Sequence, residues 1–108
     1  MKHILIALAA AISMAANAGT VYRDRFIPVP NAAPCMVSWT QNTTINGNMI
    51  LHAAIGEYPE IRGYSKVIRR YQAFRVTIVG GAYWEIEGGP EFLKTKRDEF
   101  MQRLKDCK

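Results

Sequence analysis

The stretch 59-PEIRGYSKVIRRYQ-72 decides the fold, because two pairs of expected strands flank it and its own conformation fixes how they connect. Pro59 suits the first turn of a helix, and Glu60 beside it complements the helix dipole. Apolar side chains then recur at the spacing of an amphipathic helix, at Ile61, Tyr64, Val67, Ile68 and Tyr71. Gly63 costs such a helix about 1 kcal/mol of propensity. The spacing predicts a helix over 59–72.

The segment before this helix is expected to be a hairpin. Residues 35–41 (CMVSWTQ) alternate between apolar and polar side chains, as a half-buried strand does. The dipeptide Asn46-Gly47 is a strong turn signal, and 49–55 is an apolar run of strand length. The sequence therefore predicts that 35–41 pairs with 49–55.

The segment after the helix is expected to be a second hairpin, because 74–78 and 83–87 alternate on either side of Gly80-Gly81. A two-residue turn would place apolar and charged side chains on one face. A three-residue loop, 80–82, instead pairs Ile78 with Trp84 and keeps the charged side chains together. The pattern predicts a hairpin with an odd loop or a bulge.

The last segment is expected to be a helix that begins at Pro90-Glu91. Four residues share a narrow arc of this helix, namely Leu93, Phe100, Leu104 and Cys107. Cys107 thus lies on the buried side, and Cys35 opens the first strand. Two cysteines in an exported chain favour a disulfide, and for a separation of 72 residues the chain-entropy estimate is about 4 kcal/mol. We predict a Cys35–Cys107 bridge; free thiols and an intermolecular bridge are the alternatives.

The predicted fold class is α+β with the order ββαββα. It consists of a four-stranded, mainly antiparallel sheet with two helices on one face and one disulfide. Both expected helices open with Pro-Glu and an apolar residue, at 59–61 and 90–92, which hints at a duplicated ββα unit.

The N-terminus indicates export. Residues 1–18 combine a basic start, an apolar run and a small-x-small cleavage site, which is typical of a Sec signal peptide. An uncleaved membrane anchor is the alternative, but the apolar run is short for a bilayer span. We expect cleavage before Gly19, no transmembrane anchor afterwards, and a periplasmic or extracellular protein of bacterial type. The mature chain divides into a Pro-rich extended arm or edge strand over 19–34 and one domain over 35–108.

The mature chain offers few catalytic groups. His52 is its only histidine and lies in an apolar run, and no Cys or His cluster has metal-ligand spacing. Glu85 and Glu87 share one face of an expected strand at a separation that resembles the carboxylate pair of glycosidases, although alternate acids on a solvent face are more common. We predict no cofactor, no metal and no catalytic site.

A group of basic residues is the one asymmetric feature. Five cations and no acid lie between Ile61 and Ile78, namely Arg62, Lys66, Arg69, Arg70 and Arg75. On a helix the first four would share one face and favour an anionic partner, although exposed cations also simply keep a domain soluble. Tyr64 and Tyr71 would lie on the opposite side of that helix, so a stacking platform for nucleic acid is not expected.

These patterns favour a noncatalytic binding protein, such as an inhibitor, an immunity or exclusion protein, or an accessory subunit of the envelope. Its partner would be a protein or an anionic envelope component that contacts the basic residues. Two alternatives remain open at this point. One is a small secreted enzyme or toxin acting on an anionic polymer, and the other is a component of a pilus or secretion apparatus that donates the arm 19–34 as a strand.

Overall fold

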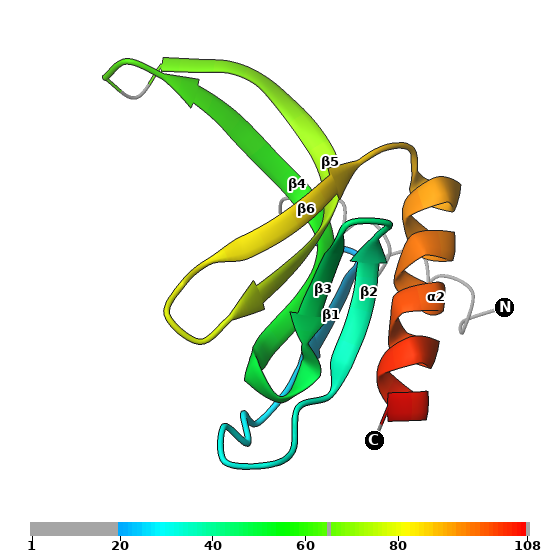
Figure 1. Cartoon of the computed structure of the whole chain (residues 1–108). Coiled ribbons are helices and arrows are strands. Elements are labelled where there is room, and N and C mark those ends of the chain that lie inside the picture. Colours follow the sequence, from blue (N-terminus) through cyan, green and yellow to red (C-terminus); the bar gives the residue numbers. More distant parts are fainter. Residues whose placement is uncertain (1–19, 65, 108) are drawn as a thin grey trace, which may run out of the picture.

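In the computed structural model, which describes residues 20–64 and 66–107, the chain is mostly β (Figure 1). Four strands form one antiparallel sheet in the order β1-β4-β5-β6, and β2 and β3 form a separate hairpin. The elements are β1 (Tyr22–Arg25), β2 (Met36–Thr40), β3 (Thr43–Asn46), the 3₁₀ helix η1 (Gly47–Met49), β4 (Ile50–Arg62), β5 (Lys66–Ile78), β6 (Tyr83–Glu87) and the α-helix α2 (Pro90–Cys107).

The helix expected over 59–72 is wrong, and with it the ββαββα order and the duplicated ββα unit. This stretch is the far half of the long β4–β5 hairpin. Gly63 has φ +60° at its turn, a conformation that glycine adopts without steric cost. On either side of the turn Ile61 pairs with Val67 and Glu60 with Arg69. Cross-strand pairs of this kind stabilise strands, and within the described residues α2 is the only α-helix.

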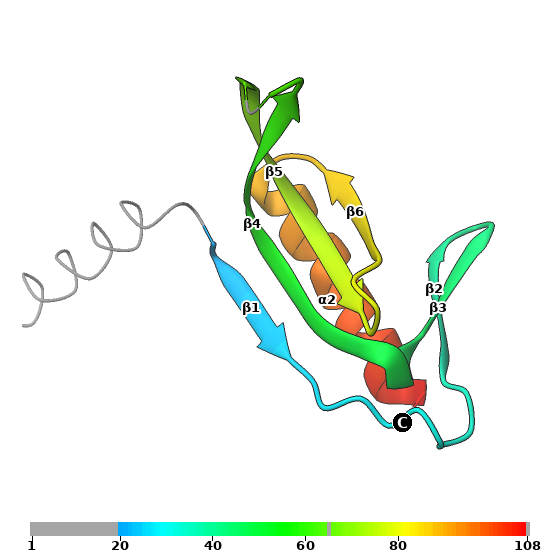
Figure 2. The same ribbon diagram turned by 90° about the vertical axis from the view of Figure 1, so that its left-hand side faces the viewer.

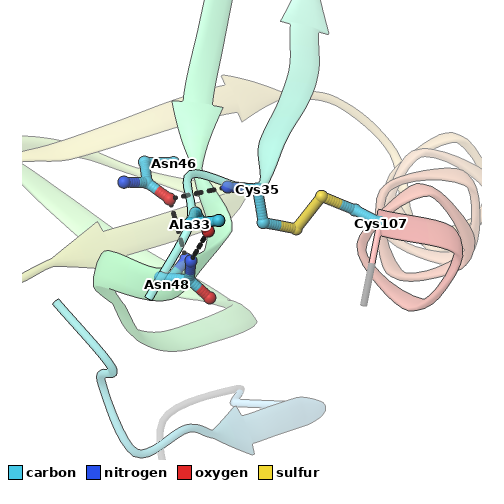
Figure 3. The surroundings of a disulfide bond; sticks show 5 residues. All are labelled: Ala33, Cys35, Asn46, Asn48 and Cys107. Carbon is cyan, nitrogen blue, oxygen red and sulfur yellow. Dashed lines mark hydrogen bonds between the residues drawn. A yellow bond between two sulfur atoms is a disulfide. The ribbon is translucent and has the colours of Figure 1, made fainter. Parts of the chain in front are cut away.

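The first expected hairpin has a different partner. β2 pairs with β3, whereas residues 50–55 belong to the four-stranded sheet. The reason is that Asn46 caps η1 instead of forming a hairpin turn. Its side-chain oxygen accepts hydrogen bonds from the backbone N–H groups of Cys35 and Asn48, at 3.2 and 3.1 Å (Figure 3). This corner directs the chain out of the small hairpin and into β4.

The β5–β6 hairpin has the predicted odd loop, although its register differs. The loop is Val79–Gly81, so Val76 pairs with Trp84 and Arg75 with Glu85. In the expected register Trp84 pairs with Ile78, so its observed partner, Val76, is two residues away from the expected one. A shift of two leaves every side chain on its predicted face, because the period of a strand is two.

The helix α2 lies along one face of the four-stranded sheet, and no described element covers the other face (Figure 2). As predicted, Leu93, Phe100 and Leu104 are its buried residues, whereas Cys107, expected on the same buried side, is exposed. Phe100 packs edge-on against Trp39 of β2 and Phe74 of β5, with ring centroids 5.7 and 5.9 Å apart. The core therefore lies between the sheet, the β2–β3 hairpin and α2.

The predicted disulfide joins Cys35, just before β2, to Cys107, the last residue of α2 (Figure 3). From the expected arm, residues 22–25 form the edge strand β1 beside β4. The predicted signal peptide, 1–18, lies outside the described residues. In the described part of the chain, no helix has the length and apolar character needed to cross a membrane.

Candidate binding surfaces: the ribbon and the open sheet face

The far half of the β4–β5 hairpin projects beyond the rest of the sheet (Figure 1). β1 pairs with β4 only as far as Ile55, and β6 pairs with β5 only as far as Ala73. Residues 58–64 and 66–71, which we call the ribbon, therefore form two strands whose outer edges have no neighbouring strand among the described residues. Pro59 fits this position, because a residue without an N–H group belongs on a free edge.

The ribbon carries large apolar side chains that face solvent. Tyr64 is fully exposed at the turn, and Ile61, Val67 and Ile68 are 54%, 49% and 46% exposed. A two-stranded hairpin is only marginally stable in water by itself. Clustered apolar side chains at an exposed position typically mark an interaction surface.

Four of the five basic residues singled out from the sequence lie on the ribbon, but they do not form one face. Side chains alternate along a strand, so Arg69 and Arg70 project from opposite faces. Arg69 donates to Glu60 at 2.7 Å and to both carboxylate oxygens of Glu87 at 2.8 and 3.0 Å. These hydrogen bonds, to Glu87 first and then to Glu60, raise the pKa of Arg69, and the same contact with Arg69 lowers the pKa of Glu87.

The remaining cations of the ribbon are paired more weakly. Arg70 reaches Glu57 at 3.4 Å, and Arg62 approaches Glu60 only to 3.8 Å. Lys66 makes no ion pair with any described residue. Acids from β4 and β6 thus neutralise much of the group, and the uncompensated positive charge lies at Arg62 and Lys66, next to the apolar tip.

The fifth basic residue, Arg75, lies on the open face of the sheet. Its guanidinium group is 3.7 Å from the ring centroid of Tyr58 and 4.1 Å from that of Tyr83. It donates to Glu85 at 2.7 and 3.0 Å, and Tyr71 donates to the same carboxylate at 2.8 Å. Burial alone would lower the pKa of Arg75, but the hydrogen bonds to Glu85 raise it above its ordinary value.

Of the groups considered for catalysis, the two glutamates are held in structural contacts. Glu85 and Glu87 each accept hydrogen bonds from an arginine, and the lowered pKa of Glu87 is the opposite of what a general acid needs. Nδ1 of His52 is buried without a hydrogen-bond partner among the described residues. Burial first, and then the charges of Arg23, Arg25 and Arg75, lower the pKa of His52.

Two hollows were not foreseen from the sequence. One, of about 400 Å³, lies between the end of β2, β6 and the middle of α2. The other, of about 520 Å³, lies near the base of the ribbon and is lined by residues that include Val21, Ile55, Gln72 and Pro90. Both hollows are lined by elements far apart in the chain, so no local sequence motif predicts them. Within residues 20–64 and 66–107, no three His, Cys, Asp or Glu side chains group together as metal ligands.

Comparisons with protein-family models, with curated proteins and with solved structures found no match.

Proposed function

We propose that this chain is an exported, noncatalytic binding protein that engages a partner protein through the ribbon. The observation that carries the proposal is the exposed apolar tip on a pair of strands whose outer edges pair with no other described strand. A free strand edge offers backbone hydrogen bonds to a partner, and the exposed side chains offer a surface to bury. Such a surface would suit an inhibitor, an immunity or exclusion protein or an envelope accessory subunit.

The charge of the ribbon indicates which kind of partner protein it would bind. Arg62 and Lys66 flank the apolar tip and are the cations least compensated by acids. Cations at the rim of an apolar contact steer an acidic partner and select against a basic one. We therefore expect an apolar patch bordered by Asp or Glu on the partner protein.

Export is part of the proposal. The signal-like segment 1–18 would deliver the chain to the periplasm or the medium, where the Cys35–Cys107 disulfide is stable. Fractionation of cells that express the full-length gene tests this step, with mass spectrometry of the mature N-terminus. We expect the mature protein to begin at Gly19 and to be absent from the cytoplasmic fraction.

The binding role is tested by capture from envelope extract with the tagged mature protein, followed by reconstitution with the purified partner. The double variant Ile61→Ser/Val67→Ser removes the apolar cross-strand pair of the ribbon. Ile27→Ser is the matched control, because Ile27 is an 88% exposed aliphatic residue outside the ribbon. We expect the double variant to bind the purified partner at least about tenfold more weakly, and the control to bind normally. Equal affinity of the two variants contradicts the proposal.

A second copy of the chain is the competing occupant of the ribbon. Light scattering of the purified mature protein at rising concentration distinguishes the two. We expect a monomer at micromolar concentration. A dimer that Ile61→Ser/Val67→Ser abolishes would make the ribbon a self-association surface instead.

A further inference from the structure

The hollow between β2, β6 and α2 has an apolar floor that the core holds in place. Trp39 is half-buried, and its ring packs against Phe74 and Phe100 at centroid distances of 5.6 and 5.7 Å. Phe100 itself is almost completely buried, and Ile86 of β6 closes the floor on the other side. A floor packed in this way keeps its shape without a ligand, as small-molecule sites usually do.

Two cations of α2 line the same hollow. Lys96 and Arg103 are seven residues apart, which is close to two helical turns and places them on the same side of the helix. Arg103 makes no ion pair within residues 20–64 and 66–107, and Lys96 approaches Glu99 only to 3.9 Å. Thr40 and Gln41 add polar groups, and none of the lining residues is acidic.

These features define a ligand by its chemistry, and we propose that the hollow binds a small organic anion that carries an aromatic ring. The ring would lie against Trp39 and Ile86, and the anionic group would bind Arg103, with Lys96 as a second cation. The volume of about 400 Å³ is within the usual range of small-molecule sites, roughly 300–1,000 Å³. This site shares no residue with the ribbon, so it stands apart from the proposed function.

The choice of an anion follows from the balance of charge at the site. An arginine side chain without a carboxylate partner, next to an apolar floor, gains most from a ligand that supplies both an anionic oxygen and a flat apolar surface. A neutral apolar ligand would leave the arginine unpaired. A long polyanion would find only these two cations along the hollow.

The test uses 1-anilinonaphthalene-8-sulfonate as the aromatic anion and N-phenyl-1-naphthylamine as its neutral counterpart. We expect the sulfonate to bind with one-to-one stoichiometry to the folded mature protein. In ¹H–¹⁵N spectra it should shift the indole N–H signal of Trp39 more than that of Trp84. The variant Lys96→Gln/Arg103→Gln should weaken sulfonate binding about tenfold or more, because two charge-assisted contacts are lost. Binding of the neutral probe should change less than twofold.

Two control variants locate the probe. Lys105→Gln removes an exposed cation two residues from Arg103, on a different side of α2, and should leave the affinity within about twofold. Ile61→Ser, on the ribbon, should also leave it unchanged. The proposal is overturned by an absence of binding, by unchanged affinity of the Lys96/Arg103 variant, or by an equal loss in Lys105→Gln. It is also overturned if Ile61→Ser abolishes binding while the Trp39 signal stays in place, because the probe would then lie on the ribbon.

Discussion

At the scale of single residues, Arg75 organises the open face of the sheet. Its flat guanidinium group fits between the rings of Tyr58 and Tyr83 and forms two hydrogen bonds to Glu85. Lysine would keep the charge but lose the planar fork and the stacking. We expect Arg75→Lys to lower the free energy of unfolding by about 1–2 kcal/mol, as measured by urea denaturation.

Arg70→Lys is the matched control for this prediction. Arg70 lies on the same strand, but it is exposed and makes a single contact at 3.4 Å with Glu57. An exposed ion pair contributes at most about 1 kcal/mol, so this variant should unfold close to the native midpoint. Equal loss in both variants would show that the ring contacts of Arg75 contribute nothing.

We expect His52 to set the pH dependence of stability near neutrality. Its pKa in the folded protein is lowered below 6.5, first by burial and then by the neighbouring arginines. The unfolded chain therefore binds the proton more readily, and stability must fall as the pH drops below about 6.5. His52→Gln should flatten this part of a plot of melting temperature against pH between 5 and 8. No other histidine is present in the chain after residue 18. A slope that survives the substitution would therefore assign the pH dependence to a group of another kind.

At the scale of secondary-structure elements, the ribbon shows where reasoning from the sequence failed. Ile61, Val67 and Ile68 fit a helical period only because a turn and a bulge interrupt the strand period. Two signals favoured the hairpin instead: these three residues are β-branched, and Gly63 lies between the two halves of the run. Charges pair across the turn as well, Glu60 with Arg69, which is the arrangement of a hairpin.

Where the strand period was unbroken, the elements were predictable. The facing of β5 and β6 followed from alternation, and α2 followed from its opening Pro90 and its apolar arc. The partner of β2 was not predictable. Asn46 caps η1 with its side chain, but in the sequence the dipeptide Asn46-Gly47 looks the same as a hairpin turn. The acids that neutralise Arg69 and Arg70 were also missed. They lie on β4 and β6, so only the correct pairing brings them to these cations.

The ribbon should be dispensable for folding, because the buried core ends at its base. We expect replacement of residues 59–70 by Asn-Gly to change the free energy of unfolding by less than about 1 kcal/mol, since it removes only exposed contacts. The far-ultraviolet circular dichroism signal of helix should not decrease, because these residues form strands. A large loss of helical signal would contradict the hairpin, and unfolding of the variant would show that the ribbon belongs to the folding core.

At the scale of the whole molecule, the disulfide adds a covalent tie between the β2–β3 hairpin and α2, which also pack against each other through Trp39 and Phe100. The β2–β3 hairpin is not part of the larger sheet, and it packs beside α2. Cys35, at the start of that hairpin, is bonded to Cys107 at the end of α2. Leu104 and the backbone of Gly47 lie close to the bridge, so an added methyl group at Gly47 would clash there. The bridge was predictable because it depended on the signal-like N-terminus, which favours an oxidised cysteine pair, and on the C-terminal helix, and not on the misread central segment.

Loss of the bridge should weaken the whole fold. The residues that it joins are 72 positions apart, and the chain-entropy estimate for such a loop is about 4 kcal/mol. Small domains are stable by only about 5–15 kcal/mol, so Cys35→Ala/Cys107→Ala should lose a large part of that margin.

Urea denaturation of the native protein and the variant measures the loss in the free energy of unfolding, which we expect to be about 2–5 kcal/mol. Dithiothreitol should destabilise the native protein and leave the variant unchanged. Hydrogen exchange should then show that amides near Leu104 lose protection before those of the β4–β5 pairs around Ile55 and Phe74, because the C-terminal end of α2 loses its covalent tie and the β4–β5 pairs lose none. A variant within about 1 kcal/mol of the native protein would show that the packing of Leu93, Phe100 and Leu104 holds α2 without the bridge.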